Sequence, residues 1–264
     1  FLEVPAQYRR LRFWRNTSIA NLEAGQTKVI PVPGLLGHEW DEDIDNGFRP
    51  PGLVHLSSTT VDDVQYLMDE GSVFDSGTAT HHLTLYRHQK SGALVFGAGT
   101  VQWSWGLDGH HDGAPGGLDL KLGQNCYSFR VGRDQLVGDG NADIQQATAN
   151  ILCDMGVPMH SPSSNLVTNC GARDFIAPDL DCRVRLDQPG AVSGTAVDKT
   201  GGYIAALEVS EDSGNSWHPP ASFDLESGRW SYRLSVSDGL GVLRVRAADD
   251  SGNLCEAVKC TSQE

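Results

Sequence analysis

The sequence predicts an α/β domain over residues 1–160, a linker over residues 161–175 and an all-β sandwich over residues 176–264. Three observations support this division. In the first part, the apolar run 29–33 leads through glycines into a cluster of carboxylates. α/β proteins usually present polar groups in this way, at the carboxyl end of a buried strand. The same part ends on an amphipathic helix, whereas in the last part short alternating strands recur about every ten residues, which is typical of a β-sandwich.

The first part contains a packing segment and several predicted strands. Basic and aromatic residues alternate over residues 8–15, where Leu11 and Trp14 can pack inward. The later strands are predicted over residues 53–59, 78–89 and 93–101. The last of these is apolar and contains glycines, which favours a fully buried strand that another backbone or a ligand approaches closely.

The helix is predicted over residues 143–156. Its apolar positions recur at helical spacing and fall on one face, formed by Ile144, Ala147, Thr148, Ile151, Leu152 and Met155. Asn141 or Asp143 can cap its start, and Gly156 with Pro158 ends it. We expect this face to be core.

The last part is predicted to consist of short strands joined by tight turns. Alternating apolar residues mark the strands, over residues 191–197, 204–210, 230–234 and 242–247. Glycine, asparagine and aspartate lie between these strands, as in hairpin or Asx-type turns.

The charge balance excludes two classes of partner. The 264 residues carry a formal net charge of −14. Nucleic acid requires a Lys/Arg surface, and an anionic membrane repels an acidic protein, so we expect neither as a partner. No apolar run approaches the roughly 18 residues of a spanning helix. The chain begins at Phe1 without a methionine, which indicates a processed chain, a subunit or a piece of a longer protein.

Six cysteines favour disulfides in an oxidising compartment. None lies in a Cys-x-x-Cys pair, so a zinc ribbon is not expected. Their pairing stays open, although Cys182 and Cys255 bracket the last domain and could cross-link it; small buried thiols are the alternative. We expect a secreted, periplasmic or cell-envelope location, with a cytoplasmic one left open.

The stretch Gly34–Asp45 is the first candidate site. One imidazole and five carboxylates occur within eight residues, from His38 to Asp45. We take His38, Glu39 and Asp41 as candidate catalytic residues. An acidic surface loop is the alternative, because runs of charge are usually solvated. Trp40 favours a loop that folds partly inward.

A second candidate site lies in the Gly- and Pro-rich stretch that begins at residue 108. His110, His111 and Asp112 could converge there on a cation, or they could form a solvated loop tip. The pair His81–His82 is a weaker candidate, since adjacent residues on a strand point to opposite faces and can hardly bind one ion.

The last part resembles the immunoglobulin-like domains that end sulfite-oxidase-type molybdenum enzymes. The similar stretches are residues 192–196, 208–217 and 244–253. The run Ser210-x-Asp212-x-Gly214-x-x-Trp217 also resembles the Asp-box turn of sialidases, where its role is structural. This resemblance implies a fold and no chemistry.

Residues 1–160 resemble the C-terminal region of the large (beta) subunit of N,N-dimethylformamidase. Three ordered stretches carry the similarity, namely residues 34–41, 91–103 and 143–156. The resemblance implies an α/β domain like a class I glutamine amidotransferase, incomplete in this chain. It also implies hydrolysis of a small amide by one iron ion, which two tyrosines and a glutamate hold.

Glu39 of this chain is the best match to the family's glutamate ligand, and Asp41 is the alternative match. His38 could serve as a base or as a supporting group beside the ligand. The family's two tyrosines lie upstream of this region, and none of Tyr8, Tyr66, Tyr86 and Tyr127 matches them. The resemblance therefore implies either a second chain that completes the site or a relative without catalysis.

Two functions follow as hypotheses. The first is a part or subunit of a bacterial dimethylformamidase-like, metal-dependent hydrolase that acts on an amide or other C–N bond. As a Lewis acid, iron would polarise the carbonyl and lower the pKa of bound water. The second is a non-enzymatic secreted or envelope-associated module for carbohydrate or protein recognition.

Overall fold

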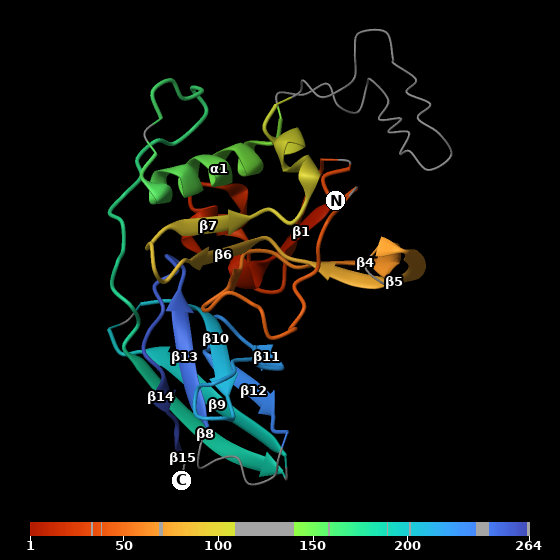
Figure 1. The fold of residues 1–264 in the computed structure, drawn as a ribbon. Helices are drawn as coiled ribbons and strands as arrows, with labels where there is room; N and C mark the ends of the chain where they lie inside the picture. The colour runs from red at the N-terminus through yellow and green to blue at the C-terminus, as the bar shows by residue number, and fades with distance from the viewer. Residues whose placement is uncertain are drawn as a thin grey trace.

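The computed structural model describes residues 1–32, 34–37, 39–68, 71–108, 140–157, 159–188, 190–200, 202–235 and 243–262. It consists of two β-rich halves that pack against each other (Figure 1). The first half contains three small sheets and helix α1 (Ala142–Met155), and the second half contains two sheets that face each other. No helix of the described residues is long and apolar enough to cross a membrane.

The sheets of the first half are built from short antiparallel pairs. β1 (Leu2–Pro5) pairs with β2 (Thr27–Ile30), and β4 (Thr59–Met68) pairs with β5 (Val73–His81). The third sheet has the order β3 (Val54–His55), β6 (Thr84–Arg87), β7 (Leu94–Gly97). Short 3-10 helices connect them, namely η1 (Ala6–Tyr8), η2 (Arg12–Trp14), η3 (Ser18–Asn21) and η5 (Val101–Gly106).

The predicted α/β, amidotransferase-like domain is wrong. Among the described residues, every strand pair of this half is antiparallel, and α1 is the only α-helix. A parallel sheet needs a crossover of a dozen or more residues between neighbouring strands. The connection from β6 to β7 is a short turn, which permits only antiparallel pairing. Val29 and Ile30 of the apolar run therefore belong to a two-stranded ribbon and not to the centre of a parallel sheet.

Helix α1 confirms the helix predicted from apolar spacing. Ile144, Ala147 and Ile151 are buried, and the helix packs against η2. The side-chain oxygen of Asn141 accepts hydrogen bonds from the backbone N–H groups of Asp143 and Ile144, both at 3.1 Å. Gly156 ends the helix with a left-handed φ of 81°, a conformation that glycine adopts without steric cost.

The second half is a two-sheet sandwich with its own core. One sheet has the order β11-β12-β9-β8-β15 and the other β10-β13-β14. The strands are β8 (Leu180–Gln188), β9 (Ala191–Asp198), β10 (Ile204–Ser210), β11 (Ser222–Phe223), β12 (Arg229–Arg233), β13 (Arg244–Asp249), β14 (Val258–Lys259) and β15 (Thr261–Ser262). Buried residues of both sheets meet in the core, among them Val184, Trp230, Val209 and Val245.

The strand order of the sandwich can be compared with that of constant-type immunoglobulin domains. In those domains strands A, B, E and D form one sheet, and C, F and G form the other. When β8 to β14 are lettered A to G in chain order, the two sheets have the same grouping. This agreement concerns strand order alone, so a relationship to immunoglobulin-like domains stays a prediction.

Two disulfides lie within the described part of the chain. Cys153 of α1 is bonded to Cys170, and Cys182 of β8 is bonded to Cys260. The suggested pairing of Cys182 with Cys255 is therefore wrong. Cys255 is a buried thiol whose sulfur accepts a hydrogen bond from the backbone N–H of Ala247. Cys126 lies outside the described residues.

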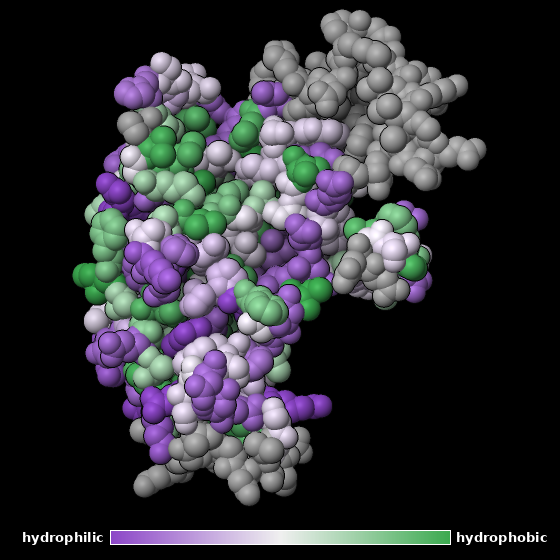
Figure 2. Space-filling view, viewed as in Figure 1, coloured by the Kyte–Doolittle hydropathy of each residue, from purple (hydrophilic) through white to green (hydrophobic). Residues whose placement is uncertain are grey.

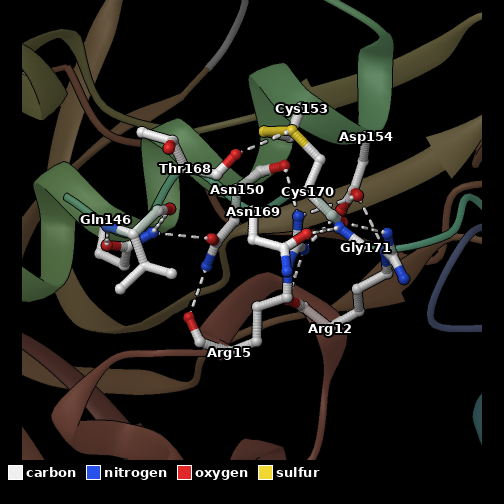
Figure 3. Close-up of a disulfide and its surroundings, with 11 residues drawn as sticks. Arg12, Arg15, Gln146, Asn150, Cys153, Asp154, Thr168, Asn169, Cys170 and Gly171 are labelled. Atoms are coloured by element: carbon white, nitrogen blue, oxygen red, sulfur yellow. Dashed lines mark hydrogen bonds and ion pairs between the residues drawn. A yellow bond between two sulfur atoms is a disulfide. The ribbon is translucent and has the colours of Figure 1, made fainter. Parts of the chain in front are cut away.

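The segment predicted as a linker is anchored to α1 (Figure 3). Beside the disulfide, the side chain of Gln146 donates to the carbonyl oxygen of Val167 and accepts from its N–H group. Arg12 donates to the carbonyl oxygen of Cys170 and to the carboxylate of Asp154, which Arg15 also contacts. These contacts tie the segment to α1 and η2 although most of its residues are exposed, and the predicted domain boundaries stay a prediction.

The two halves share a hydrophobic cluster. Ala205, Ala206 and Ala248 of the sandwich belong to the same buried cluster as Trp14 and Leu56. The loop after β2 also lies beside the sandwich, where Asp45 pairs with His218.

Candidate functional site

The acidic loop after β2 folds back onto the end of β5. Trp40 and Glu42 form isolated β-bridges with Thr100 and His81, and the N–H group of Asp41 donates to the carbonyl oxygen of Gly99 at 2.8 Å. The Trp40 ring meets His81 edge-on, with 6.0 Å between ring centroids. The loop is therefore a paired segment of the fold and not only a solvated run of charge.

The turn that delivers this loop requires glycine. Gly34 has a φ of 78°, and a Cβ atom there would lie 2.8 Å from the Trp105 ring. Glu39 also has a left-handed φ, of 48°, although it is not glycine. Such a conformation costs roughly 1 kcal/mol and occurs most often at functional sites and tight turns.

Asp43 is the centre of the site. Its carboxylate accepts hydrogen bonds from Arg49, at 2.9 Å from Nε and 2.7 Å from the terminal nitrogen, and lies 2.7 Å from His55 Nε2. Burial raises the pKa of Asp43, but the hydrogen bonds from His55 and Arg49 and the charge of Arg49 outweigh it. The pKa of Asp43 is therefore held well below its usual range, and the carboxylate is ionised at neutral pH.

His55 and Asp43 form an Asp–His pair. Because the ionised carboxylate only accepts, neutral His55 carries its proton on Nε2. Its Nδ1 is then the basic nitrogen. The side chain of His55 is 28% exposed, so water can reach the ring, whereas the carboxylate of Asp43 and the guanidinium of Arg49 are nearly covered.

Two further histidines lie beside this pair. The rings of His55 and His82 are stacked, with centroids 3.8 Å apart and an interplanar angle of 15°. Burial, and then the charge of His55, lower the pKa of His82 to about 3, so His82 is neutral at neutral pH. The Nδ1 atoms of His81 and His82 are buried without a hydrogen-bond partner within the described part of the chain.

A second polar group connects the loop to the β4–β5 ribbon. One oxygen of Glu42 accepts from the N–H group of Thr80 at 2.8 Å. The other lies 3.2 Å from the hydroxyl of Tyr66, which is also hydrogen-bonded to the carbonyl oxygen of Thr78. The hydroxyl has one proton, so it donates to one of these oxygens at a time.

The sandwich contributes to the outer edge of the site. His218 Nδ1 lies 2.8 Å from the carboxylate of Asp45, and both side chains are about one-third exposed. Glu208 accepts from the N–H group of Gly52 at 3.1 Å and pairs with Arg246 at 2.6 Å. The acidic loop is therefore held from both halves of the molecule.

Of the six site residues predicted from the sequence, the structure describes two, Glu39 and Asp41. Glu39 and Asp41 are exposed on the loop and take no part in the hydrogen bonds of the Asp43–His55 pair. His38, His110, His111 and Asp112 lie outside the described residues. The proposed roles of all six residues stay predictions.

Sequence reasoning missed His55 and Arg49, and it named His82 only as part of a weaker candidate pair for a metal ion. Asp43 was one of five carboxylates, and no spacing rule distinguishes it. His55 lies in a short apolar strand, and His82 was set aside as half of an adjacent pair. Their meeting depends on the pairing of β3 with β6, which puts His55 opposite Thr84, close to His82. The signal in the sequence was limited to histidines that interrupt apolar runs.

The iron expected from the resemblance is not accommodated by the described residues alone. They contain no group of three or more His, Cys, Asp or Glu side chains arranged to hold a metal ion. The Tyr66 hydroxyl is already bonded to Thr78 and close to Glu42. No chemical step is therefore derived through a metal ion.

The fold and the site define a β-rich protein in which Asp43 of the acidic loop pairs with His55. Residues 2–115 match a family model described as N,N-dimethylformamidase beta subunit-like, C-terminal. This match confirms the resemblance for that segment, which is less than half of the chain and includes Asp43, Arg49, His55 and His82. No curated protein and no solved structure matches the chain.

Proposed function

We propose that this chain is part of a dimethylformamidase-like hydrolase that acts on an amide or other C–N bond. The observation that carries the proposal is the Asp43–His55 pair, because it lies within the segment that matches the family. An imidazole held by a carboxylate is a general base suited to neutral pH.

In the proposed reaction His55 activates water for attack on the amide carbonyl. The water oxygen bonds to the carbonyl carbon, and its proton passes to Nδ1 of His55. The same proton then passes to the leaving nitrogen as the C–N bond breaks, which yields a carboxylic acid and an amine. Asp43 stabilises the imidazolium that forms, and Arg49 fixes the orientation of Asp43. Neutral His82 adds no repulsion to that imidazolium.

The iron site is a separate part of the proposal. When bound, iron would supply Lewis-acid polarisation of the carbonyl. Glu39 would be the ligand from this chain, and the remaining ligands would come from a partner chain or from residues outside the described part. A Glu39→Ala variant of the assembled protein should lose its iron in elemental analysis while its circular dichroism spectrum stays unchanged. Unchanged iron content would refute the assignment of Glu39.

We also propose a partner subunit and an oxidising compartment. The matching family is described as beta subunit-like, which supports assembly with another chain. The two disulfides support a secreted, periplasmic or envelope location, since cytosolic proteins rarely keep such bonds.

The experiment is an assay of amine release from N,N-dimethylformamide and related small amides by the protein isolated with its partner. His55→Ala should lower kcat by roughly 10²–10⁴-fold, the usual contribution of a general base. His218→Ala is the matched control, because that histidine also pairs with an aspartate of the loop but lies outside the Asp43–His55 pair. It should retain most of the activity.

Equal activity of His55→Ala and wild-type protein would refute the role of His55. No activity of wild-type protein on any amide would refute the hydrolase. The recognition module would then be the better hypothesis, with glycan binding as its measurement.

A further inference from the structure

The ribbon formed by β4 and β5 projects from the body of the molecule, and we call it the arm (Figure 1). Its base is fixed to the candidate site. The Tyr66 hydroxyl reaches Glu42 and Thr78, and the Tyr66 ring covers Gly77, where a Cβ atom would lie 2.7 Å from the ring. Beyond Tyr66 the two strands pair only with each other among the residues that the structure describes.

The end of the arm exposes large apolar side chains. Leu67 and Phe74 are 61% and 62% exposed, and Met68 and Val73 are 47% and 46% exposed. Figure 2 shows hydrophobic surface, in green, on the projection that stands apart at the right, where Figure 1 places the arm. An isolated two-stranded hairpin is at best marginally stable in water, so such an end is normally covered by something else.

Both faces of the arm are apolar at its end. Leu67 is paired with Phe74, and Met68 with Val73. Since successive residues of a strand point to opposite faces, one pair lies on each face. A surface that docks flat against a partner needs one apolar face. Two apolar faces fit a projection that enters a pocket.

The charge of the arm restricts the occupant. The chain carries no Lys or Arg between Arg49 and Arg87, whereas Asp62, Asp63 and Asp75 are exposed on the two strands. Anionic lipid and nucleic acid are therefore disfavoured. A second copy is disfavoured too, because each copy carries a net charge of −14.

We propose that the arm inserts into an apolar pocket of a partner protein whose rim carries Lys and Arg. The pocket would cover Leu67, Met68, Val73 and Phe74, and the rim would meet Asp62, Asp63 and Asp75. This partner is the subunit of the proposed function, so the proposal about the arm rests on that function. The arm is the surface that the partner subunit would cover.

The experiment places the photo-crosslinking amino acid p-benzoylphenylalanine at position 74 of the full chain in its native host. Position 175 is the matched control, because Phe175 is 65% exposed and Phe74 is 62% exposed. Position 74 should cross-link to one protein, at a peptide that combines apolar residues with Lys or Arg. The yield should fall at high salt, because salt screens exposed charges.

A cross-link to lipid or to a second copy, no product, or equal products from both positions would overturn the inference. A Leu67→Ser/Phe74→Ser double variant gives an independent test. It should bind the isolated partner roughly tenfold or more weakly, as buried interface anchors do, with an unchanged unfolding midpoint. If the double variant bound the partner fully and still hydrolysed amides, the docking role of the arm would be refuted and the proposed function would remain. Absence of both binding and hydrolysis in wild-type protein would refute both.

Discussion

At the scale of single residues, neighbouring carboxylates of one loop have different roles. Asp43 is nearly covered and is hydrogen-bonded to Arg49 and His55, whereas Asp45 is about one-third exposed and pairs with His218. A buried charge is stable only while its partners remain, because an unpaired charge there has lost its hydration. An exposed pair contributes little, because water already solvates both groups.

We predict that Asp43→Asn lowers the free energy of unfolding by about 2–4 kcal/mol at pH 7, because Arg49 would remain covered and would lose the carboxylate to which it is hydrogen-bonded, with only the charges of Glu208 and Asp45 nearby. Urea denaturation measures this change. Asp45→Asn is the control, and its effect should stay below about 1 kcal/mol. Equal effects of the two substitutions would show that Asp43 has no special electrostatic role.

At the scale of elements, α1 is fixed at both ends. Asn141 caps its start by accepting two backbone hydrogen bonds. Near its end, Cys153 is bonded to Cys170, and Asp154 pairs with Arg12 and Arg15. The helix therefore holds η2 and the segment that leads to the sandwich.

Asn141→Ala should lower the free energy of unfolding by about 1 kcal/mol, since alanine leaves two N–H groups without their acceptor. Thermal unfolding followed by circular dichroism measures the loss. Asn165→Ala removes an exposed hydrogen bond to Gln145 and should change the value by less than about 0.5 kcal/mol. A larger effect at Asn165 than at Asn141 would contradict the capping role.

Cys170→Ser should cost about 3 kcal/mol, because the bond closes a loop with a sequence separation of 17 and its loss frees the unfolded chain. Denaturant unfolding of the variant measures the cost. Cys153→Ser and the double variant should lose a similar amount, as each removes the same bond. Additive losses in the double variant would show that the thiols contribute separately.

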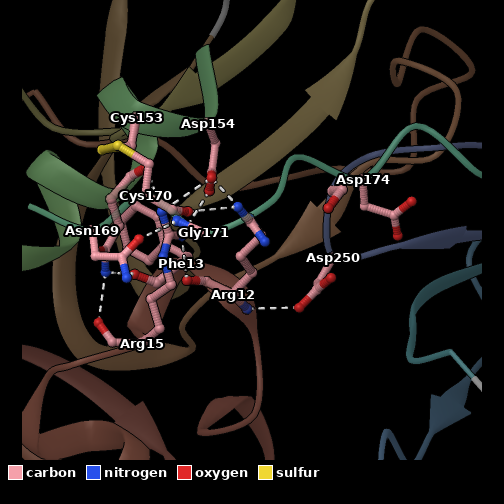
Figure 4. A network of polar contacts seen from close by, with 12 residues as sticks. Arg12, Phe13, Arg15, Cys153, Asp154, Asn169, Cys170, Gly171, Asp174 and Asp250 are labelled. Atoms are coloured by element: carbon pink, nitrogen blue, oxygen red, sulfur yellow. Dashed lines mark hydrogen bonds and ion pairs between the residues drawn. A yellow bond between two sulfur atoms is a disulfide. The ribbon is translucent and has the colours of Figure 1, made fainter. Parts of the chain in front are cut away.

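At the scale of the whole molecule, a half-buried carboxyl group lies between the two halves. Asp250 of the sandwich accepts a hydrogen bond from the backbone N–H of Arg12 at 2.7 Å (Figure 4). Burial, together with the nearby charges of Asp249 and Asp154, raises the pKa of Asp250 to about 6. The folded protein therefore binds a proton here more tightly than the unfolded chain does.

The stabilisation from this proton is fully present below the unfolded pKa of 3.8 and is lost as the pH rises through about 6. We predict that Asp250→Asn keeps the acceptor for Arg12, removes the charge and raises stability at pH 7 by about 1–3 kcal/mol. Urea unfolding at pH 4, 5, 6 and 7 measures the profile. Asp250→Ala lacks the acceptor and should gain less. Identical pH profiles for Asp250→Asn and wild-type protein would refute the raised pKa.

The sequence by itself determined the features that depend on neighbouring residues. Helix α1 follows from apolar spacing and its caps, and β9, β10, β12 and β13 follow from alternation and turn residues. The strands β8, β11, β14 and β15 were not expected from the sequence. The resemblance of the first part to the N,N-dimethylformamidase beta subunit-like family also came from sequence. Only the tertiary structure decided the strand pairing of the first half, the disulfides and the Asp43–His55 pair. The physical reason is that each of these joins residues whose distance depends on sheet register and packing, which local patterns do not fix.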